Sequence, residues 1–88
     1  MEGALKMRLM SDNDWNHIET AYRKGQELTL EREGPHESIS VSVSPAEPPW
    51  DVEMLVGIVH YRDGRGMERK WCATPEQARE HTRRLEKL

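Results

Sequence analysis

The chain has 88 residues, 33% of them charged and 35% hydrophobic, and a formal net charge of −3 at pH 7, which fits one folded domain with no room for a second core. Its single cysteine excludes an internal disulfide and a cysteine-built zinc site, and a small domain without disulfides is typical of a reducing cytoplasm. No apolar run approaches the length of a membrane span, so we expect a cytoplasmic protein with no membrane partner.

The N-terminal part of the chain predicts an arm or short strand and then a helix. Residues 1–10 contain a short alternation of apolar and polar side chains, which fits either a short strand or a flexible arm. A helix is predicted over residues 11–25, with Ser11 as N-cap, Asp14 as the acid of a capping box and Gly25 after the last turn. Its apolar residues share one face: Trp15, Ile18, Ala21 and Tyr22.

Residues 26–73 are predicted to form four antiparallel strands that pair in chain order, because the connections between them are short. The first strand, over residues 26–33, alternates Leu28 and Leu30 with polar residues. The second, over residues 38–44, alternates three β-branched apolar residues with four serines. That pattern is typical of a sheet covered on one face only.

The segment between the second and third strands is predicted to be a loop, because Pro45, Pro48 and Pro49 cannot donate hydrogen bonds to a sheet. The prolines also stiffen the segment toward an extended conformation. Trp50 follows them directly. Its indole either folds back onto the edge of the core or stands out for a partner.

Residues 54–73 predict a β-hairpin closed by a two-residue Asp63-Gly64 turn. This register predicts a core-facing row made of Met54, Val56, Ile58, His60, Met67, Arg69, Trp71 and Ala73. The opposite row is Leu55, Gly57, Val59, Tyr61, Glu68, Lys70 and Cys72. The apolar members of that second row would form an uncovered strip beside Lys70.

The last predicted element is a helix over residues 74–88, with Thr74 as N-cap, Pro75 at the first helical position and Gln77 completing a capping box. Together the elements predict one α+β domain over residues 1–88. It has an antiparallel four-stranded sheet, with a short fifth N-terminal strand as an option, and two helices packed on one face.

No motif for catalysis or for a cofactor stands out in the sequence. The four histidines are scattered, without the spacing of a metal site. A nucleophile pair of Cys72 and His60 is disfavoured, because the predicted hairpin puts the two side chains on opposite faces. We therefore expect a protein that is not an enzyme and that has no cofactor or metal.

Basic residues in the C-terminal part suggest nucleic-acid binding as one candidate function. Residues 54–88 carry eight basic and five acidic side chains, whereas residues 1–53 carry five basic and eleven acidic ones. A basic hairpin beside a basic helix could straddle a phosphate backbone, with these residues in contact: Arg62, Arg65, Lys70, Arg79 and Arg83. The order of helix, strands and helix resembles double-stranded-RNA-binding domains, but the last helix here lacks their basic start.

A protein-binding surface is the candidate that the residues favour most. An uncovered apolar strip with charged neighbours has the anatomy of a modest interface, and its predicted residues are Trp50, Leu55, Val59, Tyr61 and Lys70. The same strip could join two copies in a homodimer. A second surface could engage a basic partner by mimicking phosphate charge, through Glu27, Glu31, Glu33, Glu37, Glu47, Asp51 and Glu53.

We therefore expect a small non-enzymatic protein-binding domain that covers part of a partner's surface. Compact domains that are poor in cysteine and lack a chemical site are common among accessory proteins of phages and mobile elements, including inhibitors of host nucleases or polymerases. The alternative is a nucleic-acid-binding regulator that uses the basic hairpin and the last helix.

Overall fold

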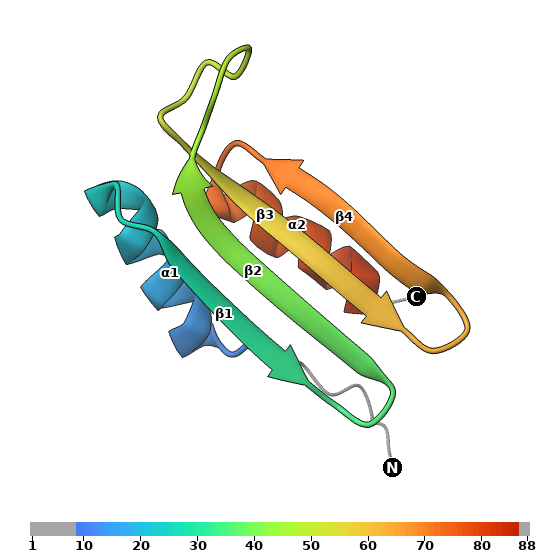
Figure 1. Ribbon diagram of the computed structural model, residues 1–88. Helices are drawn as coiled ribbons and strands as arrows, with labels where there is room; N and C mark the ends of the chain where they lie inside the picture. Colours follow the sequence, from blue (N-terminus) through green and yellow to red (C-terminus); the bar gives the residue numbers. More distant parts are fainter. Residues whose placement is uncertain (1–8, 87–88) are drawn as a thin grey trace.

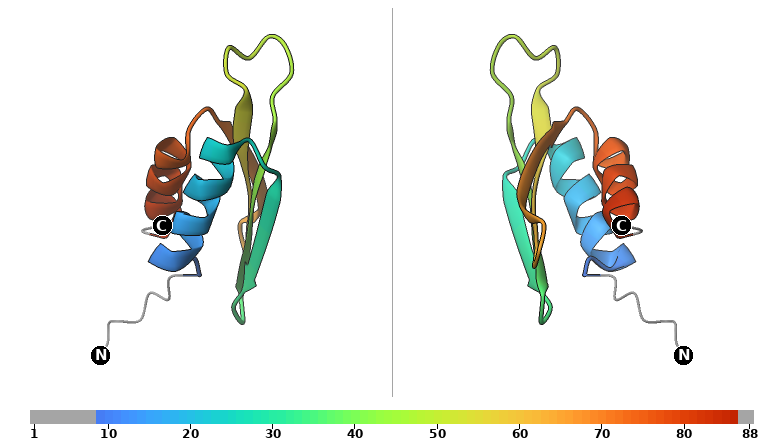
Figure 2. Two further views of the ribbon diagram at one scale, coloured as in Figure 1. Left: turned by 90° about the vertical axis from the view of Figure 1, so that its left-hand side faces the viewer. Right: turned by 90° about the vertical axis from the view of Figure 1, so that its right-hand side faces the viewer.

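Two helices pack on one face of a four-stranded antiparallel sheet (Figure 1, Figure 2). The computed structural model describes residues 9–86. Its elements are α1 (Asp12–Lys24), β1 (Leu28–Glu33), β2 (Glu37–Pro45), β3 (Met54–Arg62), β4 (Gly66–Cys72) and α2 (Pro75–Glu86). The strands are neighbours in chain order, so the predicted α+β fold is confirmed. The strand or arm predicted for residues 1–10 lies outside the described residues, apart from Leu9 and Met10, which are not in a strand.

Both helices begin at their predicted capping residues, and α1 also ends at its predicted glycine. Ser11 and Asp14 form a capping box, in which each backbone N–H donates to the other's side chain over 3.0 Å. Gly25 ends α1 in the left-handed conformation, with φ at 68°. Before α2, the N–H of Gln77 donates to Oγ1 of Thr74 over 3.1 Å. Neither of the helices that the structure describes is long and apolar enough to cross a membrane.

The core lies between the helices and the inner face of the sheet, which is the face they cover. Its fully buried large side chains come from α1, β2 and β3: Ile18, Val41, Val43, Val56 and Ile58. Met10, which precedes α1, is buried in the same cluster. The hydroxyl of Tyr22 donates to the carbonyl oxygen of Ala73 over 2.6 Å. That bond ties α1 to the connection between β4 and α2.

β1 and β2 confirm the predicted alternation of side chains. Leu28 and Leu30 pack against the core, and the serines of β2 alternate with its buried apolar residues. The third inward position of β1 holds Arg32 in place of an apolar residue. Its guanidinium donates hydrogen bonds of 3.1 and 2.7 Å to the carboxylate of Asp14. A charge pair therefore joins the sheet to the start of α1.

The turn of the β3–β4 hairpin differs from the prediction. It has three residues, Asp63 to Arg65, because Arg62 pairs with Gly66, whereas a two-residue turn was predicted. Gly64 and Gly66 both adopt positive φ, at 85° and 83°. Glycine takes this conformation without steric cost, so the two glycines accommodate the extra residue.

The extra turn residue moves the side chains of β4 to the opposite faces of the sheet, because side chains alternate along a strand. Three residues predicted to face the core lie on the outer face: Met67, Arg69 and Trp71. Three predicted to lie outside face the helix side: Glu68, Lys70 and Cys72. Cys72 is buried there and takes the core position opposite Val56 that was predicted for Trp71.

Candidate protein-binding surface

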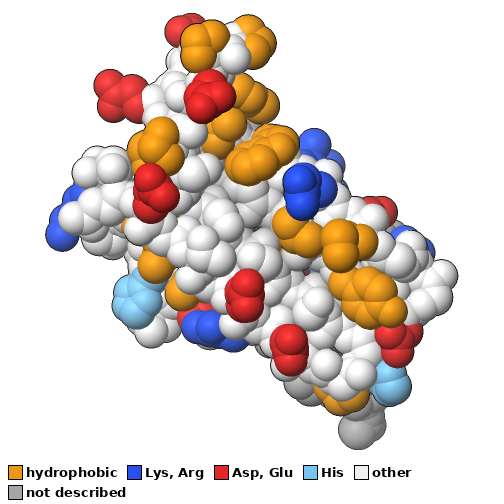
Figure 3. Space-filling model, viewed as in Figure 1, with side chains coloured by type: hydrophobic (Ala, Val, Ile, Leu, Met, Phe, Trp, Pro, Cys, Tyr) orange, Lys and Arg blue, Asp and Glu red, His pale blue; other side chains and the backbone are white. Residues whose placement is uncertain are grey.

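The outer face of the sheet, which faces away from the helices, is polar on one side and apolar on the other. β1 and β2 contribute Thr29, Glu31, Glu33, Ser38, Ser40, Ser42 and Ser44. β3 and β4 contribute Arg69 and a set of glycine and apolar residues: Leu55, Gly57, Val59, Tyr61, Met67 and Trp71. Figure 3 shows hydrophobic side chains gathered over the β3–β4 half and the loop before β3, with acidic side chains on the β1 side.

Large hydrophobic side chains are exposed at this face and in the adjoining loop. We call them the outer strip, which consists of Trp50, Tyr61, Met67 and Trp71, exposed by 44%, 40%, 68% and 46%. Tyr61 and Met67 are directly opposite each other on β3 and β4, so their side chains are neighbours. Trp50 and Trp71 line one groove. An exposed hydrophobic strip of this kind marks a surface for contact.

The indole of Trp71 lies over Gly57, its partner residue on β3. A Cβ atom at position 57 would lie only 2.6 Å from Cζ3 and 2.9 Å from Cε3 of Trp71. The missing side chain of Gly57 therefore makes the space in which the indole rests. This contact holds Trp71 against the sheet although nearly half of its surface is exposed.

Replacing Gly57 with alanine is expected to push the Trp71 indole off the sheet, because the new Cβ would overlap the ring. A Trp50→Phe background leaves two tryptophans, Trp71 and Trp15, and Trp15 is buried. We expect acrylamide quenching of tryptophan fluorescence to rise and the NMR signal of the Trp71 indole N–H to shift. Ser42→Ala changes the residue on the other side of Gly57 and should change neither signal. Equal changes in both variants would contradict the contact.

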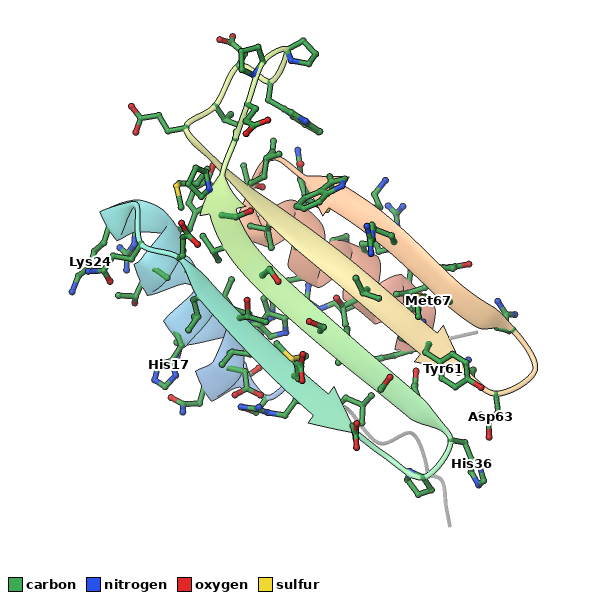
Figure 4. All side chains as sticks on the ribbon, viewed as in Figure 1. His17, Lys24, His36, Tyr61, Asp63 and Met67 are labelled. Atoms are coloured by element: carbon green, nitrogen blue, oxygen red, sulfur yellow. The ribbon has the colours of Figure 1, made fainter. Side chains whose placement is uncertain are left out.

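Tyr61 is held in place at the β3–β4 turn, beside the turn that joins β1 to β2 (Figure 4). Its hydroxyl hydrogen-bonds with Asp63, and this bond raises the pKa of the Tyr61 phenol. Asp63 also lies 2.9 Å from Nδ1 of His36, and this hydrogen bond is the main cause that lowers the pKa of the Asp63 carboxyl. The polar end of Tyr61 therefore lies beside Asp63, and its ring is exposed to solvent.

The structure corrects two of the predicted protein-binding residues. Leu55 lies on the outer face as predicted, but it is only 6% exposed. Its side chain is therefore too buried to contact a partner directly. Lys70 was predicted beside the strip, and the three-residue turn places it on the helix side of β4 instead. Trp50 and Tyr61 are exposed, and Val59 is half-buried between the ends of the strip.

Sequence reasoning missed Met67 and Trp71 because the predicted two-residue turn directed both side chains into the core. The signal for the longer turn was present in the sequence, since Gly64 and Gly66 flank Arg65. Two glycines so placed fit a turn with an extra residue better than a two-residue turn.

The basic residues predicted for nucleic-acid binding do not form one continuous basic surface. Three of them are ion-paired within the fold: Arg62 with Glu37, Arg79 with Asp12, and Arg83 with Glu80. Arg65 is exposed in the β3–β4 turn, and Lys70 lines a groove between β4 and α2. The positive charge is partly neutralised and spread over several elements, which suits a phosphate backbone poorly.

The acidic residues predicted as a second surface are also divided. The Glu37 carboxylate is turned to the inner side, 2.5 Å from Nε2 of His60 and 3.0 Å from Nη2 of Arg62. Glu31 and Glu33 lie on the outer face of β1. The others precede β1 or lie in the loop before β3: Glu27, Glu47, Asp51 and Glu53.

The inner side of the hairpin brings together no nucleophile and base. Cys72 and His60 share this face, contrary to the prediction, but Cys72 is opposite Val56, four residues and roughly 13 Å along β3 from His60. Burial raises the pKa of the Cys72 thiol, which disfavours the reactive thiolate. Within residues 9–86, no group of three or more His, Cys, Asp or Glu side chains could hold a metal ion.

The outer strip is therefore the candidate binding surface of this fold. Three of its members stand on paired strands, and Trp50 reaches the same groove as Trp71 from the neighbouring loop. No protein-family model, curated protein or solved structure matches the chain.

Proposed function

We propose that this chain is a small protein-binding domain that uses its outer strip to cover part of a partner's surface. The observation that carries the proposal is that all members of the strip are exposed, three of them on the sheet face opposite the helices and Trp50 in the adjoining loop. Leaving large hydrophobic side chains in water is unfavourable unless a partner buries them. Aromatic residues and methionine are also enriched at the centres of protein interfaces.

The surroundings of the strip suit a contact between proteins that also exist apart. Arg69 lies between the ends of the strip, opposite Val59, and Glu31 and Glu33 border the same face on β1. An apolar centre with a charged rim is the usual anatomy of such an interface. The anchoring of Trp71 over Gly57 lowers the conformational entropy lost on binding.

The proposed mode of action is occlusion, which needs no chemical step, so the proposed domain is non-enzymatic. In its specific form, the proposal is a cytoplasmic accessory protein of a phage or mobile element that inhibits a host nuclease or polymerase. The carboxylates of Glu31 and Glu33 support a basic target, because they would meet the cationic side chains that line a nucleic-acid-binding cleft.

A pull-down from native lysate with the tagged chain tests the proposal. We expect the Met67→Ser/Trp71→Ser variant to retain at least about tenfold less of a captured protein, because removing two central hydrophobic anchors costs roughly 2–4 kcal/mol of binding free energy. The matched control is His17→Ser/Glu19→Ser, which alters two exposed residues of α1. This control should retain as much as the wild type.

Equal capture by the strip variant and the wild type would contradict the proposed surface. Retention on a DNA or heparin column would point to the nucleic-acid-binding regulator instead, if it weakened steeply with salt and disappeared in an Arg79→Glu/Arg83→Glu variant.

A further inference from the structure

β4 is an edge strand, and the hydrogen bonds around it show which of its backbone groups point away from the sheet. The N–H of Asp63 donates to the carbonyl oxygen of His36 over 2.9 Å, so the backbone of Asp63 turns toward the β2 side. Because backbone groups alternate in direction along a strand, Arg62 turns toward β4 and forms a hydrogen-bonded pair with Gly66. The outward-pointing residues of β4 are then Met67, Arg69 and Trp71.

The outward-pointing edge ends at the connection between β4 and α2. Ala73 is the next residue whose backbone points outward, and its N–H donates to Oε1 of Gln77 over 3.0 Å. Within residues 9–86, no strand pairs with this edge from Met67 to Trp71, and every residue in that stretch is exposed. An exposed edge of this kind is a template for pairing with another strand.

We propose that a second copy of this chain pairs with the open edge, β4 against β4 in antiparallel orientation, about a two-fold axis at Arg69. About six backbone hydrogen bonds would form between the outward-pointing residues of the two copies. Glu68 of each copy lies opposite Lys70 of the other, and Met67 of each lies opposite Trp71 of the other. The strand is thus complementary to itself in charge and in hydrophobic side chains.

The two-fold axis at Arg69 is the most favourable register for this pairing. Outward-pointing residues must pair with each other, so the next registers place either Glu68 or Lys70 opposite its own copy and lose both opposite-charge pairs. The axis at Arg69 leaves one like-charge contact, between the two Arg69 side chains. The other edge strand, β1, has no equivalent match, because Arg32 lies between the outward-pointing Glu31 and Glu33 and cannot be paired with either.

The fold leaves room on the inner side of β4 for the inward-facing side chains of the second strand. A groove of about 290 Å³ lies there, lined by Ile58, His60, Glu68, Arg69, Lys70 and His81. A larger groove of about 520 Å³ shares Lys70 and His81 with it and extends along α2 to Trp71 and Trp50. Glu68 and Lys70 of the second copy would point to this side of the sheet, where they would enter the grooves.

The dimer would have one continuous sheet, with the outer strips of the two copies meeting at the two-fold axis. A partner would then face a surface about twice as large as that of one chain. This dimer is independent of the proposed function, because the purified chain alone would form it.

Sedimentation equilibrium of the full chain over a range of concentrations tests the dimer. We expect the wild type to change from its 10.3 kDa monomer to a species of twice that mass as the concentration rises. Glu68→Lys and Lys70→Glu each convert two opposite-charge pairs into two like-charge pairs, so each should raise the dissociation constant by about tenfold. Arg69→Thr removes the like-charge contact at the axis and should lower the dissociation constant by about threefold.

Mixing the two charge variants provides the matched control. The Glu68→Lys chain carries two lysines at these positions and the Lys70→Glu chain carries two glutamates, so a heterodimer regains both opposite-charge pairs. We expect the equimolar mixture to dimerise about as well as the wild type, whereas neither variant does so alone. Far-UV circular dichroism checks that each variant is folded.

A chain that stays monomeric up to the solubility limit would overturn the proposal. A dimer that neither charge variant weakens, or that mixing does not restore, would overturn it as well, because the copies would then meet through another surface such as the outer strip. A monomer that instead binds an extended peptide along β4 would assign the edge to a different protein.

Discussion

Replacing Asp14 with alanine is expected to lower the free energy of unfolding by about 2–3 kcal/mol, or the melting temperature by roughly 10–20 °C. The Asp14 carboxylate accepts the N–H of Ser11 in the capping box, a contact worth about 1 kcal/mol. It also accepts two hydrogen bonds from Arg32, which are stronger because they are charge-assisted. The Arg32 side chain is 41% exposed, so solvent screens part of this contribution. Urea denaturation at pH 7 measures the difference.

The same variant is expected to reveal a dependence of stability on pH. The hydrogen bonds from Arg32 are the main cause that lowers the pKa of Asp14 below its usual value of 3.8, and burial opposes them. The folded state therefore keeps this carboxyl ionised at a lower pH than the unfolded chain does. The stability that it contributes is present above about pH 4 and is lost as the pH falls through the lowered pKa.

The difference in unfolding free energy between the wild type and Asp14→Ala should therefore be largest near neutral pH and shrink toward pH 2. Asp12→Ala is the matched control, because Asp12 is an acid in the same helical turn whose side chain is 73% exposed. Its substitution should cost less than about 1 kcal/mol. A constant difference from pH 7 to pH 2 would show that the charge pair with Arg32 does not stabilise the fold.

Replacing Glu37 with alanine is expected to cost about 2–3 kcal/mol of unfolding free energy. His60 is only 5% exposed, and the Glu37 carboxylate lies 2.5 Å from its Nε2. The same carboxylate accepts a hydrogen bond of 3.0 Å from Arg62. Alanine would leave the buried imidazole without this partner, and an unsatisfied buried polar group costs about 1–3 kcal/mol. Thermal and urea denaturation at pH 7 measure the loss.

Two variants serve as controls for Glu37→Ala. Glu33→Ala removes an exposed acid from the adjoining strand and should change the unfolding free energy by less than about 0.5 kcal/mol. Glu37→Gln keeps an acceptor oxygen but removes the charge, so its cost should lie between those of the other two. If Glu33→Ala and Glu37→Ala cost the same, the contact with His60 contributes nothing specific.

Local signals in the sequence were sufficient to predict the type and order of the helices and strands, although Pro45, which was predicted to lie in the loop, is the last residue of β2 and pairs with Met54. Ser11, Gly25 and Thr74 predicted the helix ends because capping depends only on neighbouring residues. The alternation of β2 predicted which sheet face is buried. The bonds from Arg32 to Asp14 and from His60 to Glu37 join residues 18 and 23 positions apart, so no local pattern could have predicted them.

The candidate surface was predicted in part. Trp50 and Tyr61 are exposed. Their positions could be predicted because the loop and the two faces of β3 follow from local residue patterns. The β4 half was wrong, because the face of each β4 residue depends on the number of residues in the turn. A one-residue error there sent Trp71 and Met67 inward and Lys70 outward.

The three-residue turn also limits how this chain can change its length. Deleting or adding a single residue between Arg62 and Gly66 would exchange the rows of β4, so that Trp71 would face the helices and Cys72 would face water. Hairpin tips usually tolerate insertions and deletions well. At this tip, inserting or deleting two residues would leave each β4 side chain on its present face of the sheet. Inserting or deleting one residue would change both the core and the exposed surface.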